Sequence, residues 1–165
     1  PWASLTYFSG LEALFPKSKL FGSYHLGYMD LNKAHEIDAG FGTFMLIRKE
    51  ILKDVGNWDE SYFFYGEDLD YFYRIKKSGW KVMFYPEVLA HHHKGASSGL
   101  RKESASVSKA DKKTKIKTAQ ASIMAMERFY NKFYKDKYNS LITCCVLLGI
   151  KIKGLFRILK FLLIS

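Results

Sequence analysis

The sequence predicts an α/β fold, in which short apolar strands alternate with helices and a helical extension follows. Residues 36–48 form an apolar run with two glycines between charged residues, which is typical of a buried strand. Residues 67–79 place apolar side chains three to four positions apart, with acids in the first turn and lysines in the last, which is typical of a helix. Residues 116–138 are amphipathic and residues 141–165 are mainly aliphatic, so both also predict helices.

Shorter elements fill the intervals between these segments. They are, in chain order, a short helix over 49–56 capped at Gly56, a loop over 57–66, strands over 80–86 and 87–93 broken at Pro86, and a mobile basic segment over 94–113. The chain begins at Pro1 without a signal-like segment, and we expect a further part upstream.

Charge is distributed unevenly along the chain. Residues 1–93 contain 10 basic and 12 acidic residues, a net charge of −2, whereas residues 94–165 contain 16 basic and 4 acidic residues, a net charge of +12. The basic part suits nucleic acid, an anionic membrane surface or phosphate-bearing substrates. Cys144 and Cys145 are adjacent, which makes a disulfide between them implausible and favours a reducing, cytoplasmic compartment.

Three acidic residues, Glu67, Asp68 and Asp70, gather at the predicted start of the helix over 67–79. They either stabilise the helix N-terminus, where free backbone N–H groups favour negative charge, or form a reactive site. Physics alone leaves these alternatives open. Asp70 points to a different face from Asp68 and is the best candidate for simple capping or solvation. The pair Asp68 and Asp70 does not match a metal-binding D-x-D, because helical side chains diverge by about 100° per residue.

Four motifs follow one another in the middle of the chain: GFGTFMLIR, GNWDESYFFYGEDLD, SGWKVMFYPE and HHHKGASS. In this order they resemble the second half of inverting family-2 glycosyltransferases, especially bacterial rhamnosyltransferase-like members that act on surface polysaccharides. The resemblance covers about residues 36–98. It implies part of a GT-A-type, Rossmann-like mixed sheet flanked by helices. The family's N-terminal nucleotide-binding half, with its D-x-D motif, is not in this sequence.

The resemblance divides the chain into three regions. Residues 1–98 correspond to the acceptor-binding and catalytic half, residues 99–115 to a basic linker, and residues 116–165 to a helical, membrane-associating extension. It also implies acceptor-side roles. Asp68 is expected to act as the catalytic base that takes a proton from the acceptor hydroxyl. The expected acceptor-binding residues are Trp58, Asp59, Glu60, Tyr65 and Glu67.

The resemblance further implies a divalent metal, Mg²⁺ or Mn²⁺, held mostly by the absent half. A family histidine that follows the Pro-Glu turn corresponds to His92, although the run of three histidines also permits His91 or His93. The implied substrates are a nucleotide-sugar donor, with rhamnose as one candidate sugar, and a lipid-linked or polysaccharide acceptor. The implied location is the inner face of the cell membrane.

The final segment, 141–165, is long enough to span a bilayer, but Lys151 and Lys153 lie near its centre. Lys153, Arg157 and Lys160 form one stripe, which favours a helix lying in the interface of an anionic membrane. A transmembrane hairpin and a helix packed on the domain are the alternatives. A non-catalytic membrane-surface or nucleic-acid-binding protein is the rival function, but no base-reading motif is present, and we expect no nucleic-acid partner.

Overall fold

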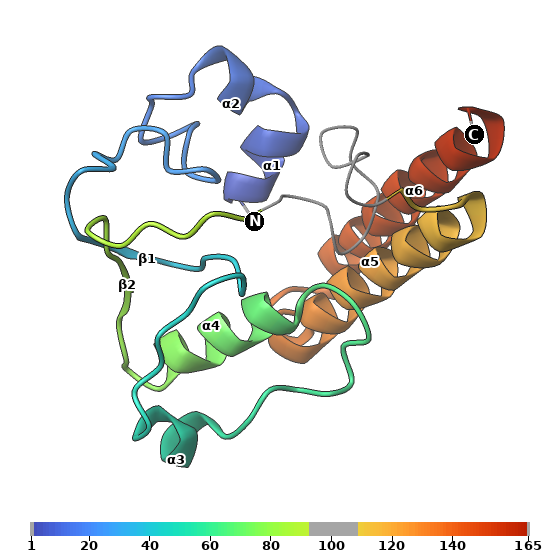
Figure 1. Ribbon diagram of the computed structural model, residues 1–165. Coiled ribbons are helices and arrows are strands. Elements are labelled where there is room, and N and C mark those ends of the chain that lie inside the picture. The colour runs from blue at the N-terminus through green and yellow to red at the C-terminus, as the bar shows by residue number, and fades with distance from the viewer. Residues whose placement is uncertain (1, 93–108, 165) are drawn as a thin grey trace. The chain divides into compact units, whose positions relative to one another are not determined.

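The computed structural model of the chain describes residues 2–92 and 109–164 (Figure 1). Its elements are, in order, α1 (Trp2–Phe8), α2 (Leu11–Leu14), β1 (His35–Ile37), α3 (Ile51–Val55), α4 (Glu67–Lys77), β2 (Val82–Phe84), α5 (Lys112–Phe133), the 3-10 helix η2 (Lys135–Lys137) and α6 (Ser140–Ile164). They form two compact units. The described residues up to 35, with 83–89, make the first, and the remaining described residues make the second.

The first unit is built around the short helices α1 and α2. The carboxylate of Glu12 is buried, accepts a hydrogen bond from the backbone N–H of His25 at 2.9 Å, and lies 3.1 Å from the His25 ring nitrogen Nδ1. Tyr7 and Tyr24 stack with ring centroids 4.4 Å apart. Because buried carboxylates require partners, the Glu12 contacts fix the loop that follows α2.

Helix α4 forms the centre of the second unit. Tyr71, Phe72 and Ile75 on α4 are buried together with Ile51 of α3 and Val82 of β2. The helix ends as its sequence predicts. Gly79 has a φ of 84°, its N–H donates to the carbonyl of Lys76, and the N–H of Trp80 donates to the carbonyl of Ile75. This pair of bonds is a Schellman ending, which requires a left-handed residue and so favours glycine.

The predicted strand over 36–48 is correct only at its start, because β1 ends at Ile37 and no strand covers residues 38–48. Its apolar side chains, Ile37, Ala39, Met45 and Ile47, pack against the core around α4 instead. A segment with alternating apolar residues must bury those residues on one side. Packing against helix α4 buries them here, so no neighbouring strand is needed. The strand predicted at 80–86 exists as β2, whereas the described residues 87–92 contain none. In the described residues the expected larger mixed sheet is reduced to β1 paired with β2.

Helices α5 and α6 form a hairpin and lie side by side (Figure 1). The Asp111 side chain caps α5 by accepting from the N–H of Thr114 at 2.7 Å, so the helix begins at Lys112 and not at residue 116. The linker predicted over 99–115 therefore ends earlier, and residues 99–108 lie outside the described residues. Lys112 at the start of α5 donates to the carbonyl of Leu162 near the end of α6, so the two helices run antiparallel.

The two helices lie closest at Gly154 of α6 among the glycine positions. A Cβ added at Gly154 would overlap the side chain of Ile123 on α5. Further along, the hydroxyls of Tyr130 and Thr143 lie 3.3 Å apart. The sequence favoured an exposed interfacial α6 over one packed on the domain, but one side of α6 packs on α5. None of the helices in the described part of the chain is long and apolar enough to cross a membrane.

We expect Gly154→Ala to destabilise the chain. Alanine has the higher helix propensity, by about 1 kcal/mol, but its methyl would overpack against Ile123, which typically costs about 1–3 kcal/mol. Gly149→Ala is the matched control, because nothing lies within 4 Å of the added atom, and it should raise stability. Thermal unfolding followed by circular dichroism measures both variants. An equal rise in melting temperature for both would show that the helices do not meet at Gly154.

Candidate active site

The candidate site lies at the N-terminus of α4. Tyr65 and Gly66 precede the helix with φ values of 69° and 90°, so two consecutive residues adopt the left-handed conformation. Gly66 is tightly enclosed, since an added Cβ would lie 3.1 Å from both Ala125 of α5 and Tyr62. A non-glycine residue at positive φ is costly and persists where the surroundings enforce it. The chain thus enters α4 by a constrained turn, which fixes the direction of Glu67 and Asp68.

Asp68 is half-buried and is held by two backbone groups. Its Oδ2 accepts from the N–H of Gly42 at 3.1 Å, and its Oδ1 accepts from the N–H of Leu69 at 2.8 Å. Gly42 is close enough that an added Cβ would lie 3.3 Å from the Asp68 Cβ and 3.9 Å from the Trp58 ring. Gly42 therefore allows its backbone to lie close to Asp68 and Trp58, because it has no side chain. The three residues meet at one place.

Trp58 is stacked on one face of its indole and is partly exposed. The stacked face lies on Tyr71 of α4, with ring centroids 4.7 Å apart and an interplanar angle of 17°. The side chain is nevertheless 39% exposed. An aromatic ring that is fixed on one side and partly exposed suits contact with the apolar C–H face of a sugar.

The other predicted acceptor residues differ in their surroundings. Glu67 is half-buried, and its Oε2 is buried without a hydrogen-bond partner among the described residues. A buried oxygen of this kind requires an explanation, and a bound polar ligand is one. Glu60 and Tyr65 are exposed, and Tyr65 packs against Phe64 with centroids 4.4 Å apart.

Asp59 is engaged in an ion-pair network and does not stand free in the loop. Its carboxylate lies 2.6 Å from Nζ of Lys132 on α5 and accepts from the hydroxyl of Ser61. The pKa of Asp59 is held well below its usual value. The hydrogen bond from Lys132 is the largest cause, and the hydrogen bond from the Ser61 side chain is the second. Burial opposes the charge on Lys132, but the bonds to Asp59 and Asp70 raise its pKa above the usual value.

Asp70 is buried, and the prediction that it serves simple capping or solvation is wrong. Its side chain is fully enclosed; Oδ1 accepts from Nε of Arg74 at 2.6 Å and Oδ2 from Nζ of Lys132 at 2.6 Å and the Tyr62 hydroxyl at 3.3 Å. A buried carboxylate is tolerated when it is paired in this way. Burial and the nearby Asp70 raise the pKa of Tyr62.

Sequence reasoning missed Arg74 and Lys132. Arg74 also donates from Nη2 to the carbonyl of Asn57 at 2.9 Å and from Nη1 to the carbonyl of Val55, so it anchors the loop that carries Trp58. The i, i+4 spacing of Asp70 and Arg74 was a usable signal for the first pair. Lys132 is 62 residues from Asp70 and had no local signal.

The expected metal site is not assembled by the described residues. His91 and His92 are exposed, and His93 lies outside the described residues. Among residues 2–92 and 109–164, no group of three His, Cys, Asp or Glu side chains could hold an ion. His92 as a metal ligand therefore stays a prediction, and no chemical step below depends on it.

A small pocket of about 270 Å³ lies between the loop before α4 and helix α5. Tyr62 and Ala125, which enclose Gly66, form part of its wall, so the pocket adjoins the start of α4. Phe63 and Arg128 also line it, and the Arg128 guanidinium lies 5.7 Å from the Tyr62 ring centroid. The pocket combines aromatic faces with a cation, which suits a polar or anionic group next to a sugar.

Comparison with known proteins assigns the family. The family described as glycosyltransferase-like family 2 matches residues 18–127, more than half of the chain, and this range contains Gly42, Trp58 and Asp68. The chain belongs to this family. It resembles the N-acetylglucosaminyl-diphospho-decaprenol L-rhamnosyltransferases of Mycobacterium tuberculosis strains CDC 1551 / Oshkosh and ATCC 25618 / H37Rv, each 40% identical over 58 residues. The match covers 35% of this chain and 19% of each relative. No solved structure matches the chain.

The membership confirms the family-2 resemblance predicted from the motifs. It agrees with the described architecture of helices and a small sheet, which is consistent with part of an α/β transferase domain. The 58 matched residues are about a fifth of the length of each relative. The match alone therefore does not assign the relatives' activity to this chain.

We expect Asp70→Asn to lower the free energy of unfolding by about 3 kcal/mol, because Arg74 and Lys132 would lose their buried partner. Asp68→Asn is the matched control at the same helix terminus. It should change stability by less than about 1 kcal/mol, since an amide oxygen can still accept from the N–H of Gly42 or Leu69. Urea denaturation measures both. An equal loss of stability in both variants would show that the ion pairs of Asp70 do not stabilise the fold more than the contacts of Asp68 do.

Lys132→Met should flatten the loss of stability in acid. The folded-state pKa of Asp59 is lowered, so its contribution is present above the unfolded value near 4 and is lost as pH falls below it. Without Lys132 this contribution largely disappears, and stability is lower at pH 7 and less steep between about pH 4 and 2. Melting temperatures across this range test the effect, with the exposed Lys81→Met as control. Parallel curves for all three proteins would contradict the assignment.

Proposed function

We propose that this chain is the acceptor-binding part of an inverting glycosyltransferase and that Asp68 is its general base. The observation that carries the proposal is the meeting of Asp68, Gly42 and Trp58. The backbone N–H of Gly42 orients the Asp68 carboxylate next to a partly exposed indole. Family membership supports sugar transfer as the reaction.

The proposed step is a direct displacement. A hydroxyl of the acceptor gives its proton to the Asp68 carboxylate as its oxygen bonds to the anomeric carbon of the donor sugar. The bond from that carbon to the nucleoside diphosphate breaks on the opposite side, and its electron pair leaves with the diphosphate. Attack opposite the leaving group inverts the anomeric configuration. Each Asp68 oxygen accepts one hydrogen bond from a backbone N–H, so lone pairs remain for the hydroxyl.

Neighbouring residues would position the acceptor. The exposed part of Trp58 would carry a sugar ring. Oε2 of Glu67, which has no hydrogen-bond partner among the described residues, would accept from a second acceptor hydroxyl. Asp59 would act indirectly, because its carboxylate is bound by Lys132 and fixes the loop that bears Trp58 and Glu60. Tyr65 would contact the acceptor from the exposed side of the turn.

The substrates and the metal follow from likeness to the relatives. Their printed name describes L-rhamnosyl transfer with N-acetylglucosaminyl-diphospho-decaprenol, so we propose a nucleotide-sugar donor, with rhamnose as the candidate sugar, and a lipid-linked acceptor of the cell envelope. A divalent ion, Mg²⁺ or Mn²⁺, would offset the charge of the leaving diphosphate. His92 would supply one ligand of this ion. The other ligands would come from a nucleotide-binding half outside this sequence. The enzyme would work from the cytoplasm at the inner face of the cell membrane.

Asp68→Asn tests the general base in the enzyme that contains this chain together with its nucleotide-binding part. Turnover should fall by about 10²–10⁴-fold, the usual contribution of a general base, while folding and donor binding stay nearly unchanged. Asp54→Asn is the control. Asp54 is exposed and accepts from Nε1 of Trp80 at 2.8 Å, a bond that an amide oxygen keeps. Steady-state transfer rates decide the question, and near-normal turnover of Asp68→Asn would sink the assignment.

A further inference from the structure

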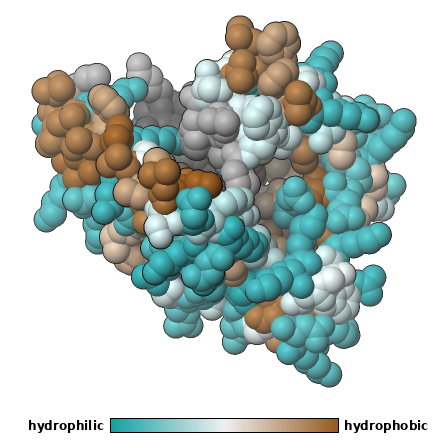
Figure 2. Space-filling view, turned by 180° about the vertical axis from the view of Figure 1, so that it is seen from behind, coloured by the Kyte–Doolittle hydropathy of each residue, from teal (hydrophilic) through white to brown (hydrophobic). Residues whose placement is uncertain are grey.

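The face of α6 that points away from α5 is apolar along most of the helix. Six of its large side chains are between 39% and 82% exposed: Leu148, Ile152, Leu155, Phe156, Leu159 and Leu163. At about 100° per residue, these six fall within an arc of about 100°. Thr143 and Gly154, which contact α5, lie on the opposite side. We call these six side chains the apolar face of α6. Figure 2 shows apolar surface at upper left, where the C-terminal turns of α6 lie.

Three of the four charges of α6 lie beside this face. The helix carries four cationic side chains and no acidic one. On the same helical projection, Lys151 lies near one edge and Lys153 and Lys160 lie near the other, whereas Arg157 projects to the opposite side. Long cationic side chains beside an apolar surface can extend toward negative head groups while their stems stay in apolar contact. The charge pattern complements an anionic lipid surface.

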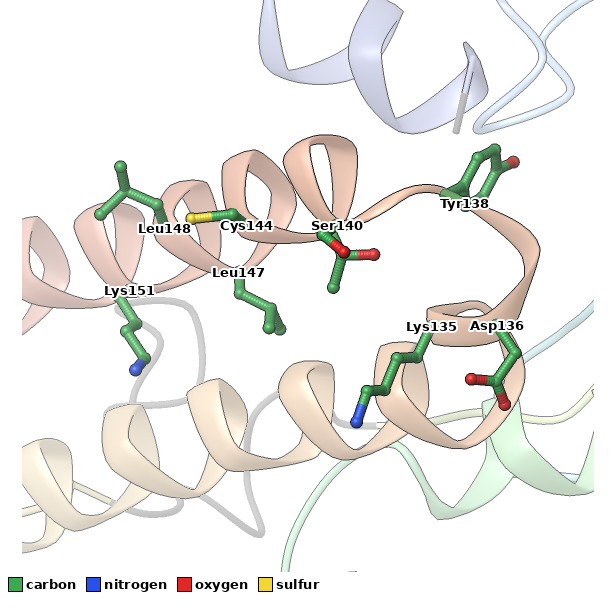
Figure 3. Close-up of a pocket in the computed structure, with 9 residues that line it drawn as sticks. Lys135, Asp136, Tyr138, Ser140, Cys144, Leu147, Leu148 and Lys151 are labelled. Carbon is green, nitrogen blue, oxygen red and sulfur yellow. The ribbon is translucent and has the colours of Figure 1, made fainter.

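A pocket of about 750 Å³ lies next to the first turns of α6, in the angle between α6 and the end of α5. Its lining includes the cations Lys135 and Lys151, the hydroxyls of Ser140 and Thr143, and the apolar side chain of Leu148. Figure 3 shows Lys151 extending from α6 toward α5, and Lys135 on η2, the short 3-10 helix that follows α5. Leu148 belongs to both the pocket and the apolar face, so the two surfaces are continuous.

We propose that α6 docks on an anionic membrane surface, with its apolar face buried at the level of the head groups and first acyl carbons. The α6 axis lies in the plane of the membrane, over about 37 Å for its 25 residues, and α5 lies on the side away from the lipid. The pocket beside Lys135 and Lys151 takes the phosphate of one anionic lipid. Asp136 also lines the pocket, and Nζ of Lys151 lies 3.9 Å from Oε1 of Glu127 on α5, so the lipid phosphate would compete with these two carboxylates for the lysines.

This inference deepens one part of the proposed function, the peripheral position at the membrane, and its test reads lipid binding alone. The purified chain is mixed with vesicles of phosphatidylcholine, with or without phosphatidylglycerol as the anionic lipid. Flotation should recover the chain with the anionic vesicles, and added salt should release it only in part, because apolar burial and charge both contribute. A failed transfer assay would leave this result untouched.

Two sets of variants separate the apolar face from the pocket. Leu155→Glu with Leu159→Glu should weaken vesicle binding at least about a hundredfold, whereas Leu14→Glu, at a leucine that is 72% exposed on α2, should not. Lys135→Gln with Lys151→Gln should weaken binding to anionic vesicles by about thirtyfold, about fivefold per lysine, and leave binding to neutral vesicles unchanged. Lys81→Gln serves as the charge control.

The adjacent cysteines report the orientation of the helix. Cys145 projects on the same arc as the apolar face, while Cys144 lines the pocket at its edge. A bimane label on Cys145 (in Cys144→Ser) should be quenched by lipids brominated in the acyl chain more strongly than a label on Cys144 (in Cys145→Ser). Equal or absent quenching overturns the proposal. So does unchanged binding by the double glutamate variant, or sedimentation showing that a second copy of the chain covers the face instead.

Discussion

The buried carboxylate of Asp70 is the constraint on which the second unit depends. A fully enclosed charge must be compensated, and Arg74, Lys132 and Tyr62 supply its three hydrogen bonds. Each partner ties a different part of the chain to α4. Arg74 reaches the loop after α3 through the carbonyl of Asn57, and Lys132 brings α5 against Asp59. The position of the candidate site follows from this arrangement, because Asp70 and Asp68 share one helical turn.

Two carboxylates two residues apart consequently have different environments. Helical geometry turns Asp68 by about 200° from Asp70, so one carboxylate points toward α5 and the other toward Gly42. Asp70 has three side-chain partners and no exposed surface. Asp68 has two backbone partners and remains half-buried, which leaves it able to meet a ligand. The buried carboxylate of Asp70 holds the helix in place, while the accessible carboxylate of Asp68 can contact a ligand. This division suits a helix that must keep its position during a reaction.

Local signals in the sequence predicted the elements that depend on local chemistry. Helix α4, its ending at Gly79 and the short helix α3 ending at Gly56 are correct, because caps and periodicity are set by neighbouring residues. The strand over 36–48 was wrong past Ile37, since apolar alternation records burial but not the partner. Asp70 resembled a capping residue for a similar reason. Its true partner Lys132 lies 62 residues away, and nothing in the local pattern identifies it. The glycosyltransferase family, by contrast, was predicted from the order of several motifs and is confirmed.

Helix α5 connects the two surfaces that function would require. On one side Lys132 binds Asp59 and Asp70, and Ala125 closes over Gly66 at the entry to α4. On another side Ile123 receives Gly154 of α6. These contacts are short and involve little-exposed groups, so the start of α4 and the apolar face of α6 are held by one continuous set of packed residues. If a membrane receives that face, the height of Asp68 above the lipid is fixed by α5. An acceptor attached to a lipid would then bring its hydroxyl to the carboxylate at a constant distance from its anchor, which reduces the orientational freedom lost on binding.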